Sequence, residues 1–243
     1  MDNNRILLFA QIANFAYNDD IVIAKKDFEN LGYSIVKYLD NNGSQAYIIE
    51  NKNEMIISFR GTELTQYSDI IADIDFIKEK DITDCGYIHK GFKKHLDLIW
   101  DDLLLVIKPN NKPLYITGHS LGASMSTIAA SRLKSSISAL ITFGSPRVGD
   151  SKFVNNLDII HYRIQNNNDI ISRLPLEAMN FKHHGKCIYL NYNGIICELT
   201  NWQMFIDSIR SHLYALYNFK LFNGIHDHSI VNYINKFNKL TVG

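Results

Sequence analysis

The segment 114–123 carries the residue pattern with the clearest chemical meaning. It reads Leu-Tyr-Ile-Thr-Gly-His-Ser-Leu-Gly-Ala, so Ser120 stands between Gly118 and Gly122, after four apolar or β-branched residues. A strand, a sharp turn and a helix in this order would present the Ser120 hydroxyl at the bend, where it can act as a nucleophile. The two glycines lack Cβ atoms and so allow strand and helix to approach closely. We therefore predict a strand over 114–117, a nucleophilic serine and a helix over 123–134.

A serine nucleophile that attacks an ester also needs hydrogen-bond donors for the oxyanion that forms. A buried strand predicted over 54–59 ends in Arg60-Gly61-Thr62, which brings the backbone N–H of Thr62 to the end of that strand. The N–H of Leu121 directly follows the nucleophile and would supply the second donor. Two donors aimed at one oxygen stabilise the tetrahedral intermediate of acyl transfer. We therefore expect Thr62 and Leu121 to form an oxyanion hole.

Where a serine nucleophile stands at such a strand–turn–helix bend, the acid of the catalytic triad follows the serine in chain order. Asp169 comes directly after a strand predicted over 159–165, at the edge of a parallel sheet where ligands collect. Asp150 fits better as the cap of a helical turn, and Asp158 precedes its strand and would lie at the wrong edge. Glu177 is a further carboxylate without such a position. The pattern therefore favours Asp169.

The base must be a histidine beyond the acid. His228 begins an apolar, helically spaced pattern that ends the chain, and it is the first candidate, with His226 as the alternative. In the resulting triad Asp169 would orient His228, and His228 would take the proton of Ser120. The remaining histidines after the acid are His183, His184 and His212.

Five motifs in order resemble a known family. They are Phe59-Arg60-Gly61-Thr62, the segment 69–76, His89-Lys90-Gly91-Phe92, Gly118-His119-Ser120-Leu121-Gly122-Ala123 and the segment 143–149. Together they are similar to the class 3 lipases, the family of the filamentous-fungal triacylglycerol lipases. The resemblance implies an α/β-hydrolase fold and supports Asp169 and His228, because the segments 169–175 and 227–233 match the family's acid and histidine segments. It also implies that His89 and one histidine of the pair 183–184 lie outside the triad.

In that family a short helix after the Arg-Gly-Ser/Thr motif covers the site. Here this candidate lid would span about 63–76, with Tyr67, Ile70, Ile71 and Ile74 at helical spacing. Such a face can close on a pocket or meet lipid. A fixed surface helix packed on the core is the alternative.

The rest of the chain predicts alternating helices and strands around one core. Its 243 residues are 46% hydrophobic and suffice for one large domain. We predict a single α/β-hydrolase domain over 1–243, with a mostly parallel central sheet flanked by helices. Further elements are expected as helices over 6–17 and 93–107, a short helical piece ending near 30, a helical turn over 153–156, strands over 33–39, 45–50, 138–143, 186–190 and 195–199, and a polar loop over 80–84.

Charge and cysteine content restrict the partners and the compartment. The formal net charge is zero, which gives no electrostatic case for binding nucleic acid. Three cysteines do not form a disulfide framework, although Cys187 and Cys197 could meet across a hairpin. The apolar stretch 6–16 is too short and too polar to span a membrane, and no signal peptide is recognised, so we expect a cytoplasmic or non-classically secreted protein. We expect no metal and no organic cofactor.

Aromatic and aliphatic residues recur at helical spacing over 201–222, just before the predicted catalytic histidine. This stripe, which includes Trp202 and Phe205, fits a helix packed on the core or one that faces lipid. With the resemblance and the candidate lid, it suggests a serine hydrolase that cleaves carboxylic esters of lipids at a lipid–water interface. The alternatives are a phospholipase A1, a soluble carboxylesterase, and a catalytically silent member that binds lipid or protein.

Overall fold

The computed structural model describes residues 1–62, 76–197, 199–200, 202–204, 206–207, 209–210 and 223–242. The lid predicted over 63–76 therefore lies, except for Phe76, outside the described residues. Most of the stripe over 201–222 also lies outside them.

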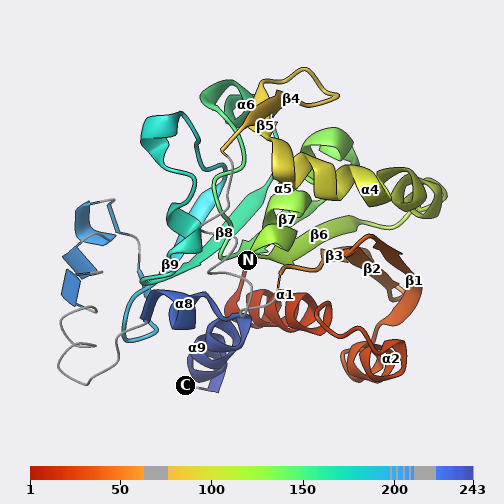
Figure 1. Cartoon of the computed structure of the whole chain (residues 1–243). Helices are drawn as coiled ribbons and strands as arrows, with labels where there is room; N and C mark the ends of the chain where they lie inside the picture. The colour runs from red at the N-terminus through yellow and green to blue at the C-terminus, as the bar shows by residue number, and fades with distance from the viewer. Residues whose placement is uncertain are drawn as a thin grey trace.

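A mostly parallel sheet organises the described part of the chain (Figure 1). The strands β3, β6, β7, β8 and β9 run parallel, and antiparallel strands extend the sheet at both edges. In the order in which they lie side by side, the strands are β1 (Ser34–Asn41), β2 (Ser44–Glu50), β3 (Met55–Phe59), β6 (Leu114–His119), β7 (Ala139–Phe143), β8 (His161–Asn166), β9 (Lys186–Leu190) and β10 (Ile196–Cys197).

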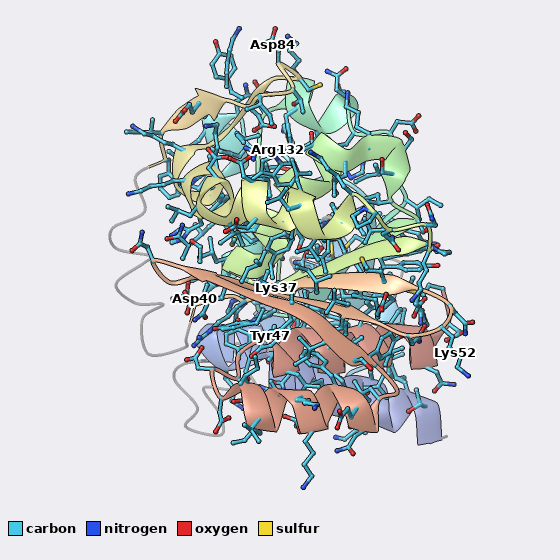
Figure 2. All side chains as sticks on the ribbon, turned by 90° about the vertical axis from the view of Figure 1, so that its right-hand side faces the viewer. Lys37, Asp40, Tyr47, Lys52, Asp84 and Arg132 are labelled. Atoms are coloured by element: carbon cyan, nitrogen blue, oxygen red, sulfur yellow. The ribbon has the colours of Figure 1, made fainter. Side chains whose placement is uncertain are left out.

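Helices cover both faces of this sheet. The helices whose bounds the structure describes are α1 (Asn3–Phe15), α2 (Ile21–Asn30), α4 (Lys90–Ile107), α5 (Leu121–Leu133), α6 (Ser151–Asn155), α8 (Asn223–His228) and α9 (Ile230–Val242), with 3₁₀ turns at Lys134–Ser136, Ile171–Arg173 and Glu177–Met179. Figure 2 shows the arrangement from the side of β1 and β2, with α4 and α5 above the sheet and α1 and α2 below it. The expected α/β architecture with a helix-flanked sheet is confirmed.

Two apolar cores follow from this layering, one on each face of the sheet. In β3, Met55, Ile57 and Phe59 face α4 and α5, whereas Ile56 faces α1. Side chains alternate between the faces of a strand, so a strand covered on both faces is apolar throughout. This explains why the central strands read as continuous hydrophobic runs in the sequence.

Most of the predicted elements are present, and the differences lie at their ends and in short pieces. Helix α4 begins three residues before the predicted start because His89 caps it, accepting a hydrogen bond from the Phe92 N–H. The polar loop predicted over 80–84 follows a three-residue strand, β4 (Lys78–Lys80), which pairs with β5 (Tyr87–His89). So short a strand of Lys-Glu-Lys has no apolar alternation that could reveal it.

The hairpin predicted near the cysteines is also present, because β9 and β10 pair antiparallel. Its register places Cys197 opposite Tyr189, and both Cys187 and Cys197 are free thiols. Among the helices that the structure describes, none has both the length and the apolarity needed to cross a bilayer.

Candidate active site

Ser120 occupies a sharp bend between β6 and α5. Its backbone has φ 58° and ψ −125°, a conformation that a residue with a Cβ rarely adopts. The Ser120 N–H donates to the Phe143 carbonyl at 3.1 Å, and the Ser120 carbonyl accepts from the Ala123 N–H in the first turn of α5. Ser120 is thus the N-cap residue of α5, and the N-terminal end of the helix dipole points at the same place. The order of strand, strained turn and helix is the local geometry that the sequence predicted around Ser120.

The glycines on either side of Ser120 are required by close packing. A Cβ on Gly118 would lie 2.5 Å from the backbone of Gly122, and a Cβ on Gly122 would overlap the Phe59 carbonyl oxygen. Helix α5 therefore passes against the ends of both β6 and β3. The end of β3 leads into the segment that contains Thr62.

The two predicted oxyanion donors belong to segments that meet at this edge. Leu121 is the first residue of α5, where a helix leaves its N–H groups without an acceptor inside the helix. Thr62 follows Gly61, whose Cα packs against the His119 carbonyl and the Tyr17 hydroxyl. The segment of Thr62 is thus held beside the residue that precedes Ser120.

Asp169 lies fully buried in the loop after β8, as expected. Its Oδ1 accepts hydrogen bonds from the N–H groups of Ile171 and Ser172 at 3.0 and 3.3 Å. Its Oδ2 accepts from the Tyr233 hydroxyl at 2.5 Å. Burial alone would raise the pKa of this carboxyl, but the His228 imidazole and the Tyr233 hydroxyl hold the pKa below its usual value. Asp169 is therefore a carboxylate at neutral pH.

His228, at the end of α8, completes a buried acid–base pair. Its Nδ1 lies 2.9 Å from both carboxylate oxygens of Asp169, and the residue is 1% exposed. An Nδ1–H that donates to a carboxylate leaves Nε2 able to accept a proton. The arrangement is the one that a histidine base requires.

Gly144 shows how the serine segment and this pair converge. It follows Phe143, whose carbonyl holds the Ser120 N–H, and it has φ +55°. A Cβ on Gly144 would lie 2.6 Å from Asp169 Oδ2 and 2.9 Å from the His228 ring. The structure therefore brings Ser120, Asp169 and His228 to one edge of the sheet, from three distant parts of the sequence.

The other carboxylates that the sequence offered lie elsewhere. Asp150 caps α6 by accepting from the Phe153 N–H at 2.8 Å. Asp158 is exposed and precedes β8, so it lies at the opposite edge. Glu177 is half-exposed and pairs with Arg147 and Lys182.

The other described histidines that follow Asp169 in the sequence contact groups other than its carboxylate. The His226 side chain is exposed and contacts Asn232, so the alternative base does not face the carboxylate. His183 contacts the Ser172 carbonyl, and His184 contacts His161. His212 lies outside the described residues.

Three contacts in the site could not be read from the sequence motifs. The pKa of His119 is lowered to about 3 by burial, with His228 nearby as a second cause, so His119 is neutral. Its Nε2 then donates to the His228 carbonyl at 2.6 Å, and its Nδ1 accepts from the Tyr17 hydroxyl at 2.7 Å. His119, the residue before Ser120, thus holds the segment that carries His228. The Tyr233 hydroxyl likewise holds the Asp169 carboxylate, and only the presence of Tyr233 in a matching motif hinted at a role.

The described residues contain no group of three or more His, Cys, Asp or Glu side chains arranged to hold a metal ion. Ser120, His228, Asp169 and the segments of Thr62 and Leu121 meet at one edge of the sheet. They offer a hydroxyl, an imidazole, a carboxylate and backbone N–H donors.

A mostly parallel sheet with a serine at a strained strand–helix turn, and an acid–histidine pair at the same edge, defines the α/β-hydrolase fold class. The family model described as Lipase (class 3) matches residues 56–179, which is just over half of the chain. The chain belongs to this family, as the resemblance in the sequence implied.

Individual relatives agree with this assignment. A lipase of Rhizomucor miehei is 31% identical over 161 residues, covering 60% of this chain and 44% of the relative. Toxin TseL of Vibrio cholerae is 31% identical over 189 residues, covering 58% of this chain and 29% of the toxin. The chain thus spans less than half the length of these curated relatives. A solved structure of the Rhizomucor miehei lipase with its propeptide has the same fold, with a TM-score of 0.71 and 23% identity over 81% of this chain and 72% of that chain.

Proposed function

We propose that this chain hydrolyses carboxylic esters of lipids, with Ser120 as nucleophile, His228 as base and Asp169 as the acid that orients it. The observation that carries the proposal is the buried Asp169–His228 pair, 2.9 Å apart, at the edge where Ser120 stands at a strained turn. Membership in the class 3 lipase family supports the same chemistry.

The reaction proceeds through an acyl-enzyme. His228 Nε2 takes the proton of Ser120 Oγ as the oxygen attacks the ester carbonyl, and the N–H groups of Thr62 and Leu121 bind the oxyanion. The imidazolium gives its proton to the leaving alcohol when the C–O bond breaks. Water then attacks the acyl group with the same base, and the fatty acid leaves. Asp169 stabilises the imidazolium in both halves of the reaction.

Two observations favour lipid over soluble esters. The curated relative from Rhizomucor miehei is named a lipase. Exposed aliphatic side chains also lie at the catalytic edge, at the start of α2 and after Asp169, and they include Val22, Ile170 and Leu176. Such side chains suit a site that works against an apolar surface.

The test compares the wild type with Ser120→Ala on chromogenic esters of increasing acyl length, triglyceride emulsion and phospholipid vesicles. We expect Ser120→Ala to lose hydrolysis by at least 10³-fold and to lose labelling by a fluorophosphonate probe. Ser131→Ala, which removes a buried hydroxyl from the same helix, is the matched control and should keep both.

The substrate panel separates the alternatives. Preference for long acyl chains and for emulsion supports acylglycerol hydrolysis, whereas cleavage of vesicles alone identifies a phospholipase. Activity limited to short soluble esters identifies a carboxylesterase. No turnover and no labelling in folded wild-type protein would overturn the proposal in favour of a silent lipid- or protein-binding member.

A further inference from the structure

Two arginines, Arg132 and Arg163, differ in whether a carboxylate balances their charge. Arg132 on α5 is paired with carboxylates. Its guanidinium is almost fully buried and contacts Asp81 Oδ1 at 2.6 and 3.0 Å and Asp97 Oδ1 at 2.6 Å. It also stacks over the Trp100 ring at 4.9 Å. A buried positive charge is stable only when it is paired in this way, because its desolvation is costly.

Arg163 on β8 differs from Arg132 in its surroundings. The residue is 7% exposed, and its hydrogen bond runs to the neutral Gln165 Oε1 at 3.0 Å. Within the described ranges of the chain, no carboxylate forms an ion pair with it, and its Nε is buried without a hydrogen-bond partner. Glu177, a nearby acid, pairs instead with Arg147 and Lys182. The charge of Arg163 therefore lacks a counter-charge from the described residues.

A cavity of about 10 Å³ lies next to Arg163, between the sheet and the helices α5 and α6. This volume accommodates one small occupant. Its polar lining consists of basic side chains and hydroxyls and contains no acid, and it includes Arg163, Lys182, His161, His183, His184 and Ser145.

The histidines around this cavity are neutral and cannot balance the arginine. Burial is the main cause that lowers the pKa of His161, His183 and His184, and the charge of Arg163 lowers each of them further. His161 Nδ1 and His184 Nδ1 lie 3.1 Å apart, so one donates and the other accepts. Arg163 thus creates a positive potential in a small, partly enclosed space.

We propose that this cavity binds a small monovalent anion of the chloride type, which acts as the counter-ion of Arg163. The anion accepts a hydrogen bond from the Arg163 Nε–H and lies within the reach of Lys182 at the rim. It converts an isolated buried charge into a pair of the kind that Arg132 already has.

The site would also stabilise the loop that carries Asp169. His183 Nε2 contacts the Ser172 carbonyl at 2.8 Å, while the Ser172 hydroxyl donates to the Asp169 carbonyl at 2.7 Å. An anion that holds His183 in place would therefore also stabilise the position of Asp169, through Ser172. Anion binding in this cavity can be measured whether or not the chain hydrolyses esters.

The test measures thermal unfolding at constant ionic strength while sodium chloride replaces sodium gluconate, whose anion is too large for the cavity. We expect each tenfold rise in chloride above its dissociation constant to raise the Tm by about 3–5 °C. Arg163→Gln should remove this dependence. Arg132→Gln, the matched control, should lower the Tm in both salts and keep the dependence.

A second measurement does not need a folded variant. Crystals of the wild type grown in sodium bromide should show an anomalous peak in the cavity, within contact distance of Arg163 Nε. Equal Tm values in the two salts would overturn the proposal, as would a cavity that holds a water and no bromide.

Discussion

The Asp169 carboxylate receives one of its hydrogen bonds from the phenol of Tyr233. The Tyr233 hydroxyl donates to Asp169 Oδ2 and accepts the Asn166 N–H at 3.1 Å, so it joins the acid to the strand that precedes it. Burial and the negative charge of Asp169 raise the pKa of Tyr233 well above its usual value. The phenol is therefore a hydrogen-bond donor at neutral pH, and we expect Tyr233 to act as a positioning residue for Asp169.

Tyr233→Phe should lower kcat/KM for a soluble ester by about tenfold, the loss expected for one hydrogen bond to a charged group. Without this donor the Asp169 carboxylate attracts the imidazolium more strongly, so the acidic limb of the pH–rate profile should move to higher pH. Tyr162→Phe on β8 is the control and should change neither. A fall in rate with an unmoved profile would show that Tyr233 is only a packing residue.

Three histidines whose pKa values are lowered by burial should make the fold sensitive to mild acid. Burial lowers the pKa of His119 to about 3 and lowers the pKa values of His161 and His183 well below 6.5. Below about pH 6.5 these histidines bind protons in the unfolded chain but stay neutral in the folded protein. The free energy of unfolding therefore falls as the pH falls. Asp169 acts in the same direction only below about 3.8, and Asp227, whose pKa burial raises, opposes it weakly.

Urea unfolding at pH 7.5, 6.0 and 5.0 checks this expectation. The midpoint should decrease steadily across the series, and the decrease should be smaller in His161→Gln, which removes one of the three groups. A midpoint that is constant from pH 7.5 to 5.0 would show that the buried histidines accept protons in the folded state.

For single residues, the sequence indicated which side chains are candidates for the site, but it did not indicate which side chains hydrogen-bond to them. The candidates Ser120 and Asp169 could be chosen because each follows a predicted strand, and His228 because it begins a helical pattern and lies in a segment that resembles the family. The hydrogen bonds of Tyr17, His119 and Tyr233 could not, since each joins residues more than 60 positions apart. Only the folded sheet brings those partners together.

The contact between β3 and α5 illustrates what the elements require of single glycines. Gly122→Ala places a Cβ against the Phe59 carbonyl oxygen and 2.8 Å from the Arg60 carbonyl carbon, so the helix must shift away from the strand. We expect a loss of about 3 kcal/mol in unfolding free energy, the upper end of the usual cost of overpacking, because the Cβ meets backbone atoms that cannot move aside.

Gly32→Ala provides the comparison for this prediction. A Cβ at Gly32 meets nothing within 4 Å, although the backbone has φ +82°. Only the backbone conformation opposes the change, at a cost of about 1–2 kcal/mol. Urea unfolding of both variants measures the difference, and similar losses would contradict the role of close packing at Gly122.

Elements with apolar periodicity were predictable, and those set by long-range pairing were not. The central strands and the helices α4 and α5 appear where the hydrophobic pattern placed them, within a few residues. The pair β4 and β5 has three residues in each strand and depends on its partner across the turn. The terminal helical pattern is also divided at Ser229, so that His228 ends α8 and α9 starts afresh at Ile230.

At the scale of the described molecule, three exposed aliphatic side chains gather at the start of α2, and their position bears on substrate access. Arg60, next to the oxyanion segment, forms an ion pair with Asp19, and helix α2 begins two residues later. The first three residues of α2 are exposed aliphatics, of which Val22 is 74% exposed. Figures 1 and 2 place α2 beneath the edge strands β1 and β2. These side chains flank the catalytic edge, on the side opposite to the Asp169 loop.

If the proposed substrate is a lipid surface, Val22 should contribute to docking there. Val22→Asp puts a charge where an apolar side chain would enter the lipid, so binding to vesicles of neutral phospholipid and hydrolysis of triglyceride emulsion should fall by about tenfold. The rate on a short soluble ester should stay unchanged, because Val22 lies outside the triad and the oxyanion segments. Co-sedimentation with vesicles and paired rate measurements check both parts.

Ile160→Asp is the matched control for Val22→Asp. Ile160 is 60% exposed and directly precedes β8, so it lies at the edge of the sheet opposite to Ser120. A charge there leaves the catalytic face unaltered, and both vesicle binding and emulsion hydrolysis should remain at the wild-type level. Equal losses in the two variants would show that the catalytic edge has no special part in docking. Losses confined to Val22→Asp would show that the molecule meets lipid with the face on which Ser120, Asp169 and His228 converge.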